Sequence, residues 1–207
     1  MSGRATVVLA TRNLKKVPEV QAILADAGVA ADVTGLGDHP GAPDVAETEP
    51  TFSGNALLKA RAIAAHTGLP AIADDSGLRV DALNGMPGVL SARWSGRFGA
   101  ATGDKDAANL DLVLDQLADT PEDRRGAEFV CAAAVAFPDG REEVTEGVLR
   151  GHIVAEPRGE NGFGYDPVFV PEGETRTTAE LSAAEKNAIS HRGIAFRDLA
   201  KRLGVLL

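Results

Sequence analysis

The amino-acid sequence predicts an α/β fold with a long mixed central β-sheet and flanking helices. In the first half of the chain, short apolar runs alternate with segments of helical periodicity, which is typical of parallel strands joined by helices. In the second half, a long apolar run precedes Pro138-Asp139-Gly140, a turn signal that indicates a hairpin. The 207 residues favour one domain, or one domain with two lobes, over residues 1–207.

The first half begins with a strand and a helix. The β-branched and apolar segment Thr6–Ala10 predicts a buried strand. Apolar residues recur at helical spacing over 17–27, where Pro18 suits the first turn and Gly28 suits the end. The other elements expected here are a strand over 31–34, a loop over 35–50, a helix from Phe52 to His66, a strand over 70–73 that runs into Asp74-Asp75-Ser76-Gly77, a strand over 78–83 and a turn over 84–88.

The second half contains the predicted hairpin and the remaining helices. Leu110, Val113, Leu114 and Leu117 form the apolar stripe of a helix over 104–117. The other elements expected here are a strand over 128–137, its return strand over 143–151, a glycine-rich loop over 159–166, a strand over 167–170, a helix that begins at the capping box of Ser182 and Glu185, and a last helix over 193–203.

Charge and composition exclude several classes of protein. The net charge of −9 disfavours non-specific binding to duplex nucleic acid, which needs clustered positive charge. No run approaches 18 apolar residues, so we expect no membrane span. The N-terminal segment lacks the apolar region and cleavage site of a signal peptide, and Cys131 is the single cysteine. We therefore expect a cytoplasmic protein without disulfides.

The segment Thr11-Arg12-Asn13-Leu14-Lys15-Lys16 lies directly between the first strand and the first helix. Backbone N–H groups at the start of a helix attract anions, and this segment adds hydrogen-bonding and cationic side chains. It therefore has the chemistry of a phosphate site. The alternative is a polar turn with solvated lysines, and the spacing of a P-loop is absent.

Adjacent acids follow a buried strand in Asp74-Asp75-Ser76-Gly77. Two neighbouring carboxylates repel each other, and binding of a hard cation such as Mg²⁺ is the chemical reason for such a pair. Glu47, in the 35–50 loop, offers a further carboxylate. The alternative is a capped turn, because Asp and Gly are also common turn residues.

The glycine-rich segment Gly162-Phe163-Gly164-Tyr165-Asp166-Pro167 suggests recognition of a base. An exposed Phe163 between two glycines has a ring on which a base can stack. Asp166 precedes a proline, which holds it in an extended conformation as an orientable acceptor. The alternative is that Phe163 and Tyr165 fill the core.

Two groups of polar residues lie on predicted helices. Lys186, His191 and Arg192 stand within seven positions and suit an anionic or carbonyl ligand, although a helix C-terminus also favours positive charge. Asn55 and Lys59 are four residues apart and share one face of the helix from Phe52. The alternative for both residues is that this face is solvated.

Taken together, these motifs resemble the inosine/xanthosine triphosphate pyrophosphatases, a family that clears non-standard purine nucleotides. The resemblance occurs in the family's order from residue 6 to about residue 203. Arg12 departs from it, because many bacterial members have Gly there. The segments that carry it are Thr11 to Lys16, Thr51-Phe52-x-x-Asn55-Ala56-x-x-Lys59-Ala60, Ala73 to Leu78, Gly85-x-Pro87-Gly88-x-x-Ser91-Ala92-Arg93, Gly162 to Pro167 and Ser190-His191-Arg192-Gly193.

The resemblance implies a homodimer of two-lobed subunits, with a nucleotide in the cleft between the lobes. It implies Mg²⁺-dependent hydrolysis of ITP, dITP and XTP to the monophosphate and pyrophosphate. Asp75 takes the position of the catalytic base and metal ligand, and Glu47 and Asp74 support the metal. The implied substrate-binding residues are Thr11, Arg12, Asn13, Lys16 and Lys59 for the phosphates, Ser76, and Phe163, Gly164, Tyr165, Asp166, Lys186, His191 and Arg192 toward the base end.

Within the implied base pocket, Asp166 accepts the N1–H that hypoxanthine and xanthine have and adenine lacks. His191 or Arg192 donates to the C6 carbonyl. Three alternative functions stay open: a pyrophosphatase with another base preference, a nucleotide-binding regulator without turnover, and a nucleic-acid-binding module. The net charge disfavours the third, a substrate panel decides the first, and metal-dependent product release decides the second.

Overall fold

The computed structural model describes residues 4–13 and 16–207, and these form a mixed α/β fold, as the sequence predicts. None of the described helices combines the length and apolar character that crossing a membrane requires. Short 3-10 turns connect several elements. The strands and α-helices in chain order are β1 (Ala5–Leu9), α1 (Lys16–Asp26), β2 (Ala31–Gly35), α2 (Phe52–Thr67), β3 (Ala71–Val80), β4 (Met86–Pro87), α3 (Gly96–Thr102), α4 (Lys105–Gln116), β5 (Gly126–Ala136), β6 (Glu142–Ile153), β7 (Phe169–Pro171), α5 (Ala183–Ile189) and α6 (His191–Leu206).

The strands form one mixed sheet in the order β2-β1-β3-β5-β6-β7, and β4 pairs with β3. β1 pairs in parallel with β2 and with β3, as expected for strands joined by helices. β4 and β7 pair antiparallel with β3 and β6. The expected hairpin turn joins β5 to β6, where the Phe137 N–H donates to the Arg141 carbonyl at 2.8 Å.

The chain divides into two compact units, and β3, β5 and β6 each contribute residues to both. Unit 1 contains residues 1–75, 131–147 and 192–207, and unit 2 contains residues 76–130 and 148–191. A single two-lobed domain over the whole chain stays a prediction.

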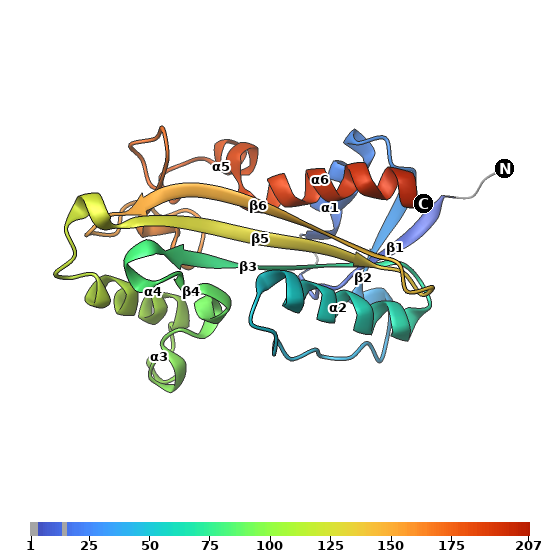
Figure 1. Ribbon diagram of the computed structural model, residues 1–207, viewed down its shortest axis with the longest axis horizontal. Helices are drawn as coiled ribbons and strands as arrows, with labels where there is room; N and C mark the ends of the chain where they lie inside the picture. The colour runs from blue at the N-terminus through green and yellow to red at the C-terminus, as the bar shows by residue number, and fades with distance from the viewer. Residues whose placement is uncertain (1–3, 14–15) are drawn as a thin grey trace. The chain divides into compact units, whose positions relative to one another are not determined.

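In unit 1, helices cover both faces of the sheet (Figure 1). α1 and α6 lie on one face, where Leu24 and Leu199 are almost completely buried in a core with Ile72 and the lone Cys131. α2 lies on the other face, and its Ala56 and Ala60 have no exposed surface. Small side chains of this kind bring a helix close to a sheet.

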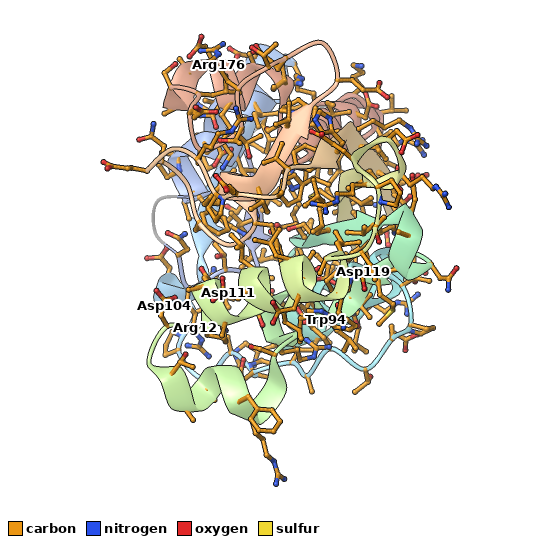
Figure 2. The ribbon with its side chains drawn as sticks, turned by 90° about the vertical axis from the view of Figure 1, so that its left-hand side faces the viewer. Arg12, Trp94, Asp104, Asp111, Asp119 and Arg176 are labelled. Atoms are coloured by element: carbon orange, nitrogen blue, oxygen red, sulfur yellow. The ribbon has the colours of Figure 1, made fainter. Side chains whose placement is uncertain are left out.

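In unit 2, α4 is the amphipathic helix that its apolar stripe predicts. Leu110, Val113 and Leu117 pack into a core with residues of β3, β5, β6 and β7. The Asp104 side chain caps the helix by accepting a hydrogen bond from Ala107 N–H at 3.0 Å. Asp111 lies on the exposed side of α4 (Figure 2).

Several local predictions were wrong: β4 lies inside the turn expected over 84–88, and residues 166–168 form a 3-10 turn before β7. Residues 70–83 do not hold two strands, because β3 runs unbroken from Ala71 to Val80 and residues 81–83 form a 3-10 turn. The Asp74-Asp75-Ser76-Gly77 segment therefore lies inside a strand and is neither a loop nor a turn. Gly77 serves the packing of this strand, because a side chain there would collide with Ser91 and with the Gly88 carbonyl. α3 was not expected, and α6 begins at His191 and ends at Leu206, so it is longer than predicted.

The packing of α6 gives a stability prediction. Leu199 is 1% exposed, whereas Val205 on the same helix is 87% exposed. Leu199→Ala removes buried methyl groups and leaves a cavity, so it should lower the free energy of unfolding by about 2–5 kcal/mol. Val205→Ala should change it by less than about 0.5 kcal/mol. Urea unfolding followed by circular dichroism measures both, and equal losses would contradict the assigned core.

Candidate active site

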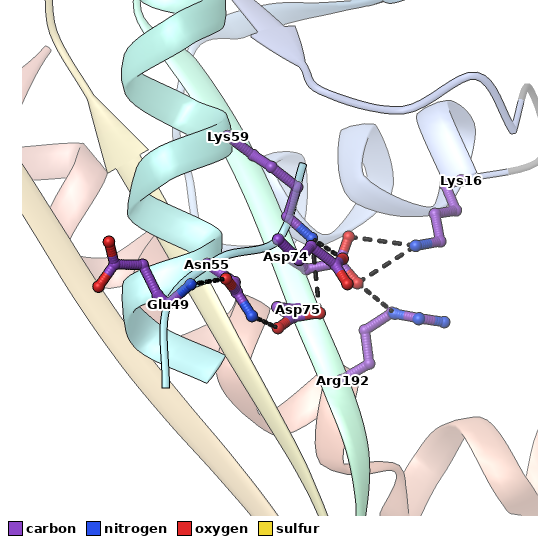
Figure 3. Close-up of polar contacts among 8 residues, drawn as sticks. Lys16, Glu49, Asn55, Lys59, Asp74, Asp75 and Arg192 are labelled. Atoms are coloured by element: carbon purple, nitrogen blue, oxygen red, sulfur yellow. Dashed lines mark hydrogen bonds and ion pairs between the residues drawn. The ribbon is translucent and has the colours of Figure 1, made fainter. Parts of the chain in front are cut away.

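Two neighbouring carboxylates in the middle of β3 meet different partners. Successive side chains of a strand point to opposite faces of the sheet. Asp74 meets Lys16 at the start of α1 and Arg192 at the start of α6, whereas Asp75 meets residues of α2 (Figure 3). The alternation therefore separates the two acids and gives each its own set of hydrogen-bond donors.

Asp74 holds two cations. The Lys16 Nζ lies 3.1 and 3.2 Å from its two carboxylate oxygens, and the Arg192 Nε lies 3.2 Å from Oδ2. Only 7% of the Asp74 side chain is exposed. Burial by itself raises the pKa of this carboxyl, but Lys16 and Arg192 outweigh burial and hold the pKa below its usual value. Asp74 is therefore an ionised anchor for both cations.

Asp75 is held by two residues of α2. The Asn55 Nδ2 donates to Oδ2 at 3.0 Å, and the Lys59 Nζ lies 3.5 Å from Oδ1. Burial raises the pKa of Asp75 to about 6, although Lys59 and Asn55 oppose the shift and the nearby Glu47 adds to it. A carboxyl with such a pKa exchanges a proton near neutral pH, as a general base must.

Lys59 joins Asp75 to the loop before α2. Its ammonium lies 3.0 Å from Glu47 Oε1, so two carboxylates share one cation. Among the residues that the structure describes, no group of three His, Cys, Asp or Glu side chains is arranged to hold a metal ion. The oxygens of Glu47 and Asp75 nevertheless suit Mg²⁺, which binds one or two carboxylates and completes its shell with waters and phosphate oxygens.

The local sequence explains how α2 presents these groups. The Thr51 hydroxyl caps the helix by accepting a hydrogen bond from Gly54 N–H at 3.0 Å. Asn55 and Lys59 then follow four residues apart and so share a face. A solvated face was the alternative, and for Asn55 it is wrong, because this side chain has no exposed surface. No site role was predicted for Asn55. The pattern that could have revealed one is its position four residues before Lys59, next to the small residues of the buried face of the helix.

The predicted phosphate segment after β1 is only partly described. The Thr11 hydroxyl accepts a hydrogen bond from Asn13 N–H at 3.1 Å and so stabilises the turn. Arg12 and Asn13 are exposed. Leu14 and Lys15, which belong to the same motif, lie outside the described residues.

In unit 2, Asp166 organises the glycine-rich loop. Its Oδ2 accepts a hydrogen bond from Phe163 N–H at 2.8 Å and pairs with the Lys186 ammonium, while Oδ1 accepts from the Thr178 hydroxyl at 2.9 Å. Gly162 has a φ of +83°, and a side chain there would collide with the Asp166 carboxylate. A glycine is therefore needed at position 162, because the Asp166 carboxylate lies where a side chain would be.

The two aromatic residues of this loop have opposite environments. The Phe163 ring is 70% exposed, and the Lys186 Nζ lies 5.4 Å from its centroid. Tyr165 is buried and donates from its hydroxyl to the Ser91 carbonyl at 2.8 Å. The ring of Phe163 is therefore accessible for stacking, as one interpretation of this motif expects, whereas Tyr165 belongs to the core, as the alternative expects.

The remaining predicted residues of unit 2 lie as follows. His191 stacks on Phe129, with ring centroids 5.1 Å apart and an interplanar angle of 14°. Ser76 follows Asp75 in β3 and is half-buried. Gly164 has a φ of +60°, which favours glycine at this position in the loop.

The chain thus combines an α/β fold with two buried acids on β3 that face lysine and arginine side chains. The chain belongs to the Ham1 family, whose model matches residues 7–202.

Relatives of the chain match it over nearly its whole length. It is 62% identical to a dITP/XTP pyrophosphatase of Streptomyces avermitilis, over 97% of this chain and 98% of the relative. It is similar to the crystal structure of the nucleoside-triphosphatase / dITP/XTP pyrophosphatase of Mycobacterium abscessus, with a TM-score of 0.79, 51% identity, and coverage of 94% of this chain and 98% of that one. It also resembles a HAM1 protein of Coxiella burnetii, with a TM-score of 0.87, 42% identity, and coverage of 96% and 98%. The family and the mixed α/β fold are thereby confirmed.

The geometry of Asp74 predicts its contribution to stability. Asp74→Asn removes the buried negative charge that Lys16 and Arg192 face, so it should lower the free energy of unfolding by about 3 kcal/mol. The control is Asp139→Asn, because Asp139 forms an exposed ion pair with Arg141 and its loss should have little measurable effect. Urea unfolding in metal-free buffer compares the two variants. Equal stabilities would show that Asp74 is not the anchor.

Proposed function

We propose that this chain is a Mg²⁺-dependent nucleoside-triphosphate pyrophosphatase. It hydrolyses the non-standard purine nucleotides ITP, dITP and XTP to the monophosphate and pyrophosphate, and so removes them from the nucleotide pool. The observation that carries this proposal is the 62% identity, over nearly the full length, with a protein named as a dITP/XTP pyrophosphatase. The charge arrangement at Asp74 and Asp75 supports it independently.

The phosphate end of the nucleotide is bound by the cations of unit 1. Lys16 and Arg192 are held in place by Asp74, and each keeps about a fifth of its side chain exposed. Lys59 is a further phosphate ligand, and the Thr11 to Asn13 turn adds polar groups to the same end. Phosphoryl transfer depends mainly on positioning and charge neutralisation, which is what fixed cations supply.

The reacting water is activated by Asp75. The Asp75 carboxylate takes a proton from this water as its oxygen attacks the α-phosphorus. The bond from the α-phosphorus to the bridging oxygen then breaks, and pyrophosphate leaves with that oxygen. When bound, Mg²⁺ lowers the charge on the phosphates and favours ionisation of water. Glu47 and Asp75 would hold the metal ion, with Asp74 as the neighbouring carboxylate.

The base end of the nucleotide is bound by the loop of unit 2. The exposed ring of Phe163 stacks on the purine, between Gly162 and Gly164 in the loop that Asp166 stabilises. An ionised carboxylate offers about four acceptor sites. Asp166 uses three of them within the protein and therefore keeps one for the purine N1–H. His191 donates to the C6 carbonyl. Arg192 shared this prediction, and we assign it instead to the phosphate end, since Asp74 binds its Nε beside Lys16.

Ser76 and Lys186 complete the proposed substrate-binding residues, whereas Tyr165, which was expected among them, is buried and bonded to the Ser91 carbonyl. The proposed enzyme works in the cytoplasm as a homodimer, and sedimentation of the purified protein tests the assembly.

A nucleotide panel tests the reaction. ITP, dITP and XTP should release pyrophosphate with a kcat/KM at least about 100-fold above that of ATP, because adenine would leave the buried Asp166 acceptor unpaired. EDTA should abolish release from every nucleotide. Binding of ITP without pyrophosphate release would favour a regulator, release from pyrimidine triphosphates would favour another base preference, and release of orthophosphate would mean that a different phosphorus is attacked.

Substitution of Asp75 tests its role as the base. Asp75→Asn keeps the size of the side chain but removes the proton acceptor, so kcat should fall by about 10²- to 10⁴-fold. Binding of ITP, measured by calorimetry, should remain detectable because the cations at Asp74 are untouched. A variant with near wild-type turnover would exclude Asp75 as the base.

A further inference from the structure

We propose that Asn55 is a positioning residue for the reaction, which fixes the orientation of the Asp75 carboxylate and joins it to the loop that carries Glu47. This inference rests on the proposed function and extends it to Asn55, a residue for which the sequence predicts no role. Asn55 has no exposed surface, and both polar ends of its side chain are bonded. The Nδ2 donates to Asp75 Oδ2 at 3.0 Å, and the Oδ1 accepts from the Glu49 N–H at 2.9 Å.

The first consequence concerns rotation of the Asp75 carboxylate. α2 contacts its two oxygens separately, with Asn55 on Oδ2 and Lys59 on Oδ1 (Figure 3). A carboxylate held at both oxygens cannot turn about its Cβ–Cγ bond without losing a contact. The Asn55 amide is neutral, buried and bonded to a backbone N–H, whereas the Lys59 side chain is 18% exposed and its ammonium is shared with Glu47. Oδ2 is therefore the fixed oxygen, and Oδ1 is the oxygen left to act.

The second consequence concerns the loop before α2. The Glu49 N–H that Asn55 accepts lies two residues from Glu47. Glu47 in turn reaches Lys59, four residues after Asn55 on the same helix. A single side chain thus connects the backbone of this loop to the strand that carries Asp75. Displacement of Asn55 would change the spacing between Glu47 and Asp75, the two carboxylates that suit a divalent cation.

The test is Asn55→Ala, with Asn109→Ala as a matched control. Asn109 is also a buried asparagine on a helix, 2% exposed, and its Oδ1 accepts from Ser95 N–H at 2.8 Å and from the Ser95 hydroxyl at 2.7 Å. Both variants lose buried hydrogen bonds and should unfold at lower urea concentrations. Only Asn55→Ala removes a contact to Asp75.

Two readouts separate positioning from a structural role. Manganese binding to the nucleotide-free protein, titrated by electron paramagnetic resonance, should weaken about 10- to 100-fold in Asn55→Ala and stay unchanged in Asn109→Ala. With ITP and saturating Mg²⁺, kcat should fall by a similar factor of about 10 to 100 in Asn55→Ala, with KM unchanged. Wild-type manganese affinity and kcat in Asn55→Ala would overturn the proposal, as would equal losses in both variants.

Asn55→Ser covers the case in which the alanine variant does not fold. Serine leaves a smaller void than alanine and keeps a polar group, but its side chain is too short to contact Asp75. The same decreases in manganese affinity and kcat are therefore expected. If the wild-type protein releases pyrophosphate from no nucleotide, the proposed function fails. The comparison of manganese affinities would still decide the role of Asn55.

Discussion

The site depends on the alternation of side chains along β3. Asp74 and Asp75 are adjacent in sequence, and on one face they would repel each other at close range. Because they lie inside a regular strand, one carboxylate faces α1 and α6 and the other faces α2. The same covalent neighbours therefore have opposite properties: the pKa of Asp74 is lowered by two cations, and that of Asp75 is raised by burial. One acid becomes a permanent anchor and the other a group that can exchange a proton.

The helices around β3 are arranged to serve these two acids. α1 and α6 each begin close to Asp74, so Lys16 and Arg192 approach it from the first residues of their helices. α2 instead runs along the other face, and its alanines bring it close enough for Asn55 to reach Asp75. Core packing and site geometry are thus set by the same contacts. A change in the distance between α2 and the sheet would move Asn55 and Lys59, which contact Asp75.

The sequence predicts most of the fold. Apolar periodicity marks the helices observed at Phe52–Thr67 and Lys105–Gln116, and the turn residues Pro138-Asp139-Gly140 mark the hairpin. It fails at Asp74 to Gly77, where acids and glycine are typical of turns but the burial of β3 between helices overrides that preference. It also misses the role of Asn55, because no local pattern says whether a polar residue on a helix meets solvent or a buried carboxylate. The sequence predicts which residue types form the site, whereas only the tertiary structure shows which side chains contact one another.

The net charge of −9 says little about the charge at the site, and the ion pairs explain why. Lys16, Lys59 and Arg192 each lie against a buried or half-buried carboxylate and keep only about a fifth of their side chains exposed. A lysine so held loses little further freedom when it binds an anion, whereas a solvated lysine on a flexible stem must first be ordered. The acids at these positions therefore do not cancel the function of the cations. They hold the cations in place, so that in the proposed function an acidic protein can still bind a polyanionic ligand.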